Sequence, residues 1–74
     1  MKKTRSRFYF MLYVYDVESR IVIATISSPI EKKCLDAFED ANFDVENVGC
    51  TFEPRFESKD GLVMGKDCQA LYVG

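Results

Sequence analysis

The feature that most constrains the fold is a run of apolar and aromatic residues at positions 8–15, which reads FYFMLYVY. A strand with core on one side and water on the other alternates apolar with polar residues, and this run does not. As a strand it would place Phe8, Phe10, Leu12 and Val14 on one face, and Tyr9, Met11, Tyr13 and Tyr15 on the other. The second face, here called the tyrosine face, therefore needs a cover beyond a one-sided core.

The length and composition predict one small globular domain. The chain has 74 residues, of which 47% are hydrophobic and 14% aromatic, so it is too apolar for a disordered segment. A chain of this size buries only about 60% of the surface exposed on unfolding. It therefore has little room for a deep substrate cavity. We expect a single domain over residues 1–74, in which residues 1–6 form a flexible basic arm.

The pattern after the first strand predicts a hairpin and then a helix. Residues 16–20 are a polar connection of hairpin length, and residues 21–26 are a β-branched, apolar second strand. In the following SPIE segment, Ser28 fits the N-cap of a helix, Pro29 its first position and Glu31 the acid of a capping box. We expect Asn42 to end the helix in the left-handed conformation and Phe43 to fold back onto Phe38.

The remaining third of the chain predicts further strands. Residues 45–52 form a third strand that Pro54 interrupts, residues 58–61 form a turn, and residues 62–64 and 68–73 form two short strands around a turn at 65–67. The order is β-β-α-β-β(-β). We therefore predict an α+β fold, with an antiparallel sheet of four to five strands and one helix packed on one face. The inward face of residues 21–26 and of residues 68–73 stays open, because both segments are apolar on both sides.

No pattern in the sequence points to catalysis, and we expect neither a cofactor nor a bound metal. There is no histidine to activate a cysteine nucleophile, and the four glycines are scattered rather than gathered in a phosphate-binding loop. Cys34, Cys50 and Cys68 are widely spaced and odd in number, without a zinc-like pairing. We expect reduced, buried thiols in a cytoplasmic protein, although a disulfide between two of them stays possible. The run at 8–15 is too short to cross a membrane.

The tyrosine face is the first candidate for a binding surface. Tyrosine combines a large apolar body with a polar tip, which suits a contact that is only partly dry. Three covers are open: loops or residues 53–66 of the chain itself, a second copy in a homodimer through the sheet, or another macromolecule. A partner would be held by Tyr9, Met11, Tyr13 and Tyr15.

An acidic patch is the second candidate. The predicted helix carries Lys32 and Lys33 in its first turns and acids near its end, opposite to what the helix dipole favours. A surface whose charges are unfavourable for the local structure, without an evident structural gain, is a candidate for a binding role. The patch consists of Asp36, Glu39, Asp40, Asp44 and Glu46. It could meet a basic protein groove, including one that normally holds nucleic acid, or it could be a merely solvated face.

These observations favour a small, non-catalytic protein-binding module that occupies a basic surface of its partner. By size and charge it is comparable to inhibitors encoded by phages and mobile elements, which is an analogy and not a derivation. The alternative is a nucleic-acid binder, in which Lys2, Lys3, Arg5 and Arg7 hold phosphates and the aromatic strand stacks bases. The net charge of −2 counts against it. A third hypothesis is a structural homodimer subunit. No membrane partner is expected.

Overall fold

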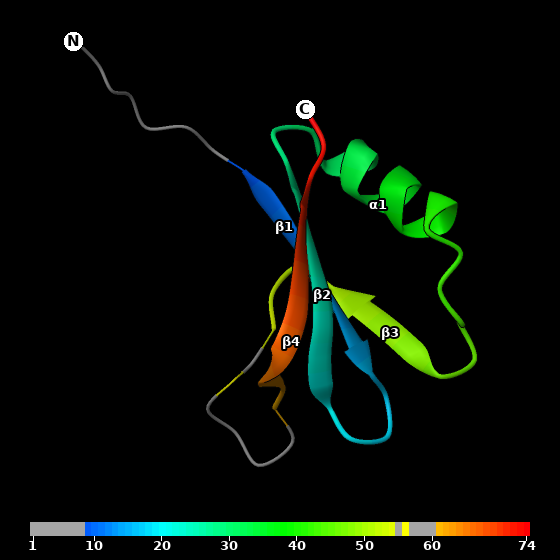
Figure 1. Cartoon of the computed structure of the whole chain (residues 1–74). Coiled ribbons are helices and arrows are strands. Elements are labelled where there is room, and N and C mark those ends of the chain that lie inside the picture. Colours follow the sequence, from blue (N-terminus) through cyan, green and yellow to red (C-terminus); the bar gives the residue numbers. More distant parts are fainter. Residues whose placement is uncertain (1–8, 55, 57–60) are drawn as a thin grey trace, which may run out of the picture.

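The computed structural model describes residues 9–54, 56 and 61–74. The strands of this part form one sheet in the order β3-β1-β2-β4, and the helix packs on one side of it (Figure 1). The α+β class with a single helix against the sheet is confirmed. The predicted arm at 1–6 and most of the predicted turn at 58–61 lie outside the described residues. The elements are β1 (Phe10–Asp16), β2 (Ile21–Ser28), α1 (Glu31–Asp40), β3 (Val48–Thr51) and β4 (Val63–Tyr72).

The centre of the sheet is the predicted antiparallel hairpin of β1 and β2. Its turn is held by the Asp16 carboxylate, whose Oδ1 accepts hydrogen bonds from the backbone N–H groups of Glu18 (2.8 Å) and Ser19 (3.1 Å). The register is regular up to Val14 and then shifts, so that Tyr15 lies opposite Val22. Residues opposite each other in a sheet point to the same face. Val22 is therefore on the tyrosine face.

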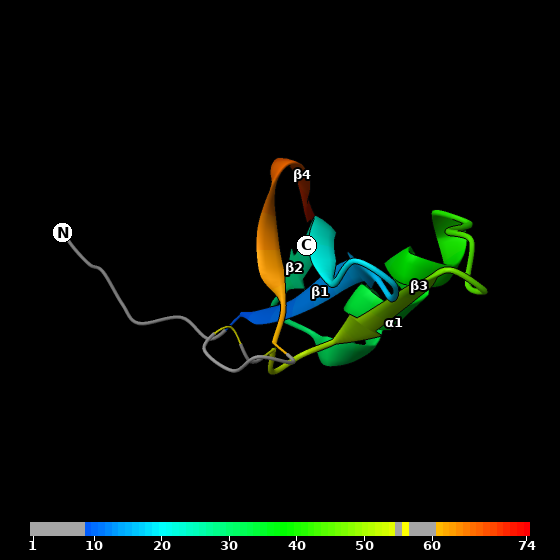
Figure 2. The same cartoon turned by 90° about the horizontal axis from the view of Figure 1, so that it is seen from below.

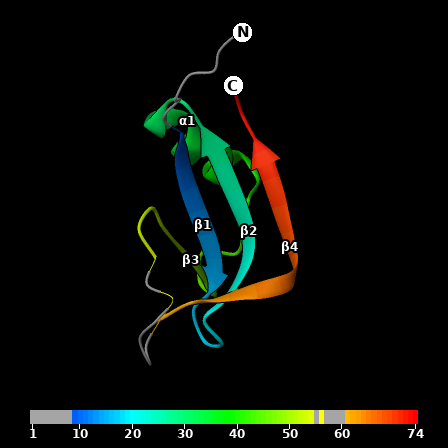
Figure 3. The same cartoon turned by 90° about the vertical axis from the view of Figure 1, so that its left-hand side faces the viewer.

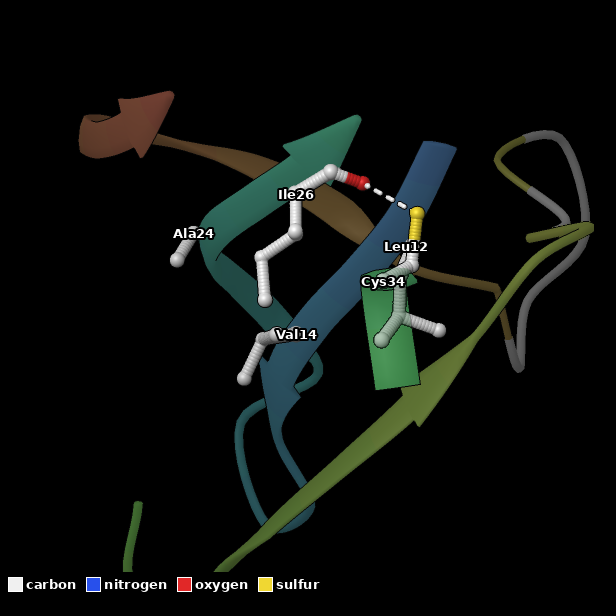
Figure 4. Close-up of a cluster of buried hydrophobic side chains, with 5 residues drawn as sticks. All are labelled: Leu12, Val14, Ala24, Ile26 and Cys34. Carbon is white, nitrogen blue, oxygen red and sulfur yellow. Dashed lines mark hydrogen bonds between the residues drawn. The ribbon is translucent and has the colours of Figure 1, made fainter. Parts of the chain in front are cut away.

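The core lies between this hairpin and α1. Leu12 and Val14 from β1, Ala24 and Ile26 from β2, and Cys34 from α1 are all essentially buried and in mutual contact (Figure 4). The Cys34 Sγ lies 3.3 Å from the carbonyl oxygen of Phe10 and 3.5 Å from that of Ile26, so its single S–H can donate to either of them. The helix thus contributes one fully buried side chain and one weak donor for the strand carbonyls.

The helix ends as predicted but begins later. Asn42 has a φ of 59°, and the ring of Phe43 stacks on Phe38 with centroids 5.3 Å apart. At the other end, the predicted N-cap Ser28 is still the last residue of β2, and Ile30 is the residue that precedes the helix. The Ser28 hydroxyl accepts a hydrogen bond from the Ile30 N–H (3.0 Å), which forms the turn between strand and helix instead of a capping box.

The third strand is shorter than its predicted range of 45–52. The backbone oxygen of Asp44 accepts hydrogen bonds from the N–H groups of Asn47 (2.9 Å) and Val48 (3.0 Å), and its carboxylate accepts from the Glu46 N–H (3.3 Å). This turn delays extended pairing until Val48. From there β3 pairs antiparallel with β1, which makes β3 one edge of the sheet.

The fourth strand differs most from the expectation. The two predicted short strands at 62–64 and 68–73 are one continuous element, β4, and it runs parallel to β2 rather than antiparallel to a neighbour. The sheet is therefore mixed. Val22 pairs with Met64 and Ala24 pairs with Gln69, so residues 65–68 lie opposite Ile23 alone. The predicted turn at 65–67 is this irregularity, at which β4 bends sharply (Figures 2 and 3).

Gly65 is required at this bend by close packing against β2. A Cβ atom added there would lie 2.6 Å from the backbone oxygen of Val22 and 2.9 Å from Cγ2 of Ile21. We predict that Gly65→Ala lowers the free energy of unfolding by about 1–3 kcal/mol, in the range of other overpacked sites. Urea unfolding followed by circular dichroism measures the change. The control is Gly74→Ala, where the added Cβ is 3.5 Å from its nearest neighbour and should have little effect. Equal stability of the two variants would contradict this account.

Burial of cysteines predicts a loss of stability at high pH. Burial raises the pKa of the Cys34 thiol above its ordinary value of 9.0, and it raises the pKa of Cys50 in the same direction. Above the ordinary pKa the unfolded chain ionises while the folded chain keeps its protons, so the free energy of unfolding falls as pH rises through this range.

We expect the wild type to lose stability between about pH 8 and pH 10, and Cys34→Ala to lose less over the same interval. The slope against pH is compared, because the substitution also changes core packing. Leu12→Val is the control: it disturbs the same cluster without removing a thiol and should keep the full slope. The measurement is chemical unfolding at several pH values. A Cys34→Ala slope as steep as that of Leu12→Val would contradict the prediction.

Candidate functional site: a sheet face and an acidic helix

Half of the tyrosine face is covered within the chain itself. The ring of Tyr15 lies over Gly49 of the neighbouring β3, where an added Cβ would come within 2.9 Å of it. Tyr13 meets Phe56 edge to face, with ring centroids 5.7 Å apart. Leu62 is 6% exposed and Val22 is fully buried, although neither belongs to the helix-side core. The start of β4 crosses the lower ends of β1 and β2 on the side away from α1 (Figure 3).

The sequence left three possible covers for the tyrosine face. At the Tyr15 end of this face, the cover is the described part of residues 53–66. This use of Tyr13 and Tyr15 inside the fold leaves both half-buried. The remaining end of the face is different.

The exposed end of the tyrosine face forms a patch of large side chains. Met11 pairs with Ser27 and Ser27 with Tyr72, so Met11 and Tyr72 lie on the same face with a small residue between them. Tyr9 joins them, because its ring is 5.6 Å from that of Tyr72 and the two hydroxyl groups are 3.3 Å apart. The aromatic patch consists of Tyr9, Met11, Phe56 and Tyr72, which are 41%, 39%, 43% and 59% exposed.

Two members of this patch were not singled out by sequence reasoning. Tyr72 reaches it only because β4 pairs in parallel with β2, and Phe56 only because its ring packs against Tyr13. Both depend on contacts between residues far apart in sequence. The only local signal was the pair of apolar runs around residues 62–73, which gave no direction for the strand.

The acidic patch lies on the helix and the loop after it. Asp36, Glu39 and Asp40 are exposed residues of α1, and Asp44 and Glu46 are exposed residues of the turn that precedes β3. Two of these acids have local partners. Asp36 forms an exposed ion pair with Lys32, with 3.4 Å between Oδ2 and Nζ, and the carboxylate of Asp44 stabilises the turn described above. An exposed pair of this kind contributes little to stability.

The two predicted binding surfaces therefore lie on opposite sides of the sheet. The helix lies on one side of the sheet (Figure 1). It covers the face formed by Leu12, Val14 and Ile26, and the strand register places Met11 and Tyr72 on the other face. The structure brings Tyr9 and Met11 together with Tyr72, and it brings Asp36, Glu39 and Asp40 together on one helix. It does not join the two sets into one continuous surface.

The unusual charge order of the helix has a partial structural explanation. Lys33, in the first turn of α1, donates a hydrogen bond from Nζ to the backbone oxygen of Gly74 at 2.7 Å. This contact ties the helix to the residues that follow β4. A cation near the helix N-terminus is unfavourable for the dipole, and here it gains a hydrogen bond between two elements.

A hollow opens beside the bend of β4. It has a volume of about 600 Å³ and is lined mainly by apolar side chains, among them Ile21, Ile23, Val63 and Met64, with Lys66 and Asp67 also in its lining. The bend creates it, because residues 65–68 leave the plane of the sheet opposite Ile23. Sequence reasoning took these residues for an ordinary turn and so gave no sign of the hollow.

The described residues hold no group of three or more cysteine, aspartate or glutamate side chains placed to bind a metal ion. All three cysteines are free thiols; Cys34 is buried, and Cys50 and Cys68 are half-buried. Within the same part of the chain, no helix has the length and apolar character needed to cross a membrane. Comparison with known proteins finds no matching family model, curated sequence or solved structure.

Proposed function

We propose that this protein is a small, non-catalytic binding module that acts by occupying a surface of another protein, in the manner of an inhibitor. The observation that carries the proposal is the aromatic patch. Tyr9, Met11 and Tyr72 lie close together at one end of the sheet, Phe56 packs against Tyr13 nearby, and all four side chains stay about 40–60% exposed. Tyrosine, phenylalanine and methionine are the residue types enriched at the centres of protein interfaces. A cytoplasmic location belongs to the same proposal.

The acidic patch supports a partner with a basic surface. Because it lies across the sheet from the aromatic patch, it does not need to touch the same part of the partner. Charges act over about 8–10 Å at physiological salt, so this patch would mainly orient and accelerate the encounter. The aromatic patch would then supply the lasting contact. A basic groove that normally holds nucleic acid is the kind of partner surface that fits these two roles, attraction by the acidic patch and contact by the aromatic patch.

The proposal predicts that Met11→Glu weakens partner binding by about tenfold or more, because it places a charge in the centre of an apolar contact. The full chain serves as bait, and captured proteins are quantified by mass spectrometry, followed by affinity measurement on the leading candidate. Val17→Glu is the matched control, since Val17 is 44% exposed in the β1–β2 turn, away from the patch. A partner that both variants retain equally would contradict the role of the patch.

Reversal of charge at Asp36, Glu39 and Asp40 to lysine should act differently. We expect slower association at low salt and a small effect at high salt, because exposed charges are screened. Surface plasmon resonance at two ionic strengths separates the association rate from the dissociation rate. An effect on the dissociation rate alone would contradict a steering role for the acidic patch.

Nucleic-acid binding is the second candidate. The observation in its favour is the exposed pair of rings Tyr9 and Tyr72. Tyr9 lies two positions after the basic segment 2–7 in the sequence. Binding of single-stranded DNA that falls steeply with salt and is lost on deletion of residues 2–7 would support this candidate over the first. Binding that is indifferent to both would count against it.

A further inference from the structure

The edge of the sheet formed by β4 is the starting point. Among the described residues β4 pairs on one side only, with β2, and it lies at the border of the sheet (Figure 3). The Val73 N–H donates to the Ser27 oxygen at 2.9 Å, so the backbone groups of Val73 point toward β2. The N–H and C=O of one strand residue point to the same edge, and successive residues alternate. The backbone groups of Ala70 therefore point outward.

Native proteins normally protect such edges with short strands, prolines, charges or bulges. The β3 edge is protected in this way, because the strand has four residues and is followed by Glu53 and Pro54. The first half of β4 is also protected, by its bend and by Lys66 and Asp67. Residues 68–74, in contrast, contain no charge and no proline, and their pairing with β2 is regular from Gln69 to Tyr72.

We propose that this segment of β4 pairs with the same segment of a second copy of the chain, antiparallel and around a two-fold axis at Ala70. In that register Ala70 lies opposite Ala70 of the partner subunit, and each outward N–H at this position meets the other's C=O. A symmetric dimer of this kind uses one surface on both subunits. The proposal is independent of the proposed function, since it concerns the edge of the sheet and not its exposed face.

Charge favours a second copy as the occupant. The chain has a net charge of −2, and six of its twelve acidic residues lie on α1 and the turn after it, whereas residues 68–74 contain none. In the register centred on Ala70, the regularly paired residues 69–71 carry no charge, and Lys66 and Asp67 lie at the bend, outside the new strand pair. No two like charges face each other across the new strand pair. Two copies can therefore approach along this segment without the repulsion that other surfaces of an acidic chain would bring.

The dimer would also place the two aromatic patches on one continuous surface. Thr25 pairs with Tyr13 and also with Ala70, so the Ala70 side chain lies on the tyrosine face. Its small size at the axis allows the two sheets to join without a bulky side chain between the patches. The partner of a binding module would then meet a surface about twice as wide as one subunit provides.

The test is the mass of the full chain in reducing buffer, measured by size exclusion with light scattering over a range of concentrations. We expect twice the chain mass of 8.5 kDa for the wild type. Ala70→Pro removes the outward N–H at the axis and should give the monomer mass, and an edge strand tolerates proline where its N–H does not serve the sheet. Ala70→Thr keeps the N–H and should remain dimeric. Circular dichroism confirms that each variant is folded.

If Ala70→Pro fails to fold, Ala70→Lys provides the second test, because it places two like charges next to each other at the axis. It should be monomeric at low salt and regain the dimer at high salt. A wild type that is monomeric throughout, or a folded Ala70→Pro that stays dimeric, would overturn the proposal. A dimer that Met11→Glu separates and Ala70→Pro does not would also overturn it, in favour of pairing through the tyrosine face.

Discussion

The structure depends on one constraint, which is that β1 carries large apolar and aromatic side chains on both faces while the described chain has a single helix. The helix can cover one face only. It buries Leu12, Val14 and Ile26 and contributes Cys34 to their cluster. The other face has to be covered by chain without regular layers of its own, and the bent start of β4 crosses it (Figure 3). Phe56 and Leu62 are the side chains that meet this need.

This cover reaches only part of the tyrosine face, and that has a consequence for function. A chain of this size cannot bury every apolar residue it carries. At the Tyr15 end the rings pack against Gly49 and beneath the crossing segment, so they serve the fold. At the Tyr9 end the side chains of Met11 and Tyr72 stay exposed next to each other. The same strand therefore has a structural half and a half that is available for contact.

Local features of the fold were predictable from the sequence, and features set by distant contacts were not. The hairpin, the helix end at Asn42 and the stacking of Phe43 on Phe38 depend on residues near one another, so their patterns indicated them directly. The direction of β4 was open, because residues 68–73 are apolar on both sides and fit either orientation. For the same reason the sequence did not show that Tyr72 lies on the tyrosine face, and Tyr72 was not among the predicted site residues. The acidic residues were found, but their separation from the aromatic patch required the sheet order.

The parallel pairing of β2 with β4 also determines how the chain assembles. Ser27 and Leu71, joined by a side-chain hydrogen bond across these strands, are 44 positions apart, whereas the hairpin forms from neighbours. Closing a long loop costs entropy before any contact offsets it, so we expect the hairpin and helix to form first and β4 to dock last. The hydrogen bond from Lys33 to Gly74 can then form only after β4 has paired with β2, and it fastens the end of the chain to α1.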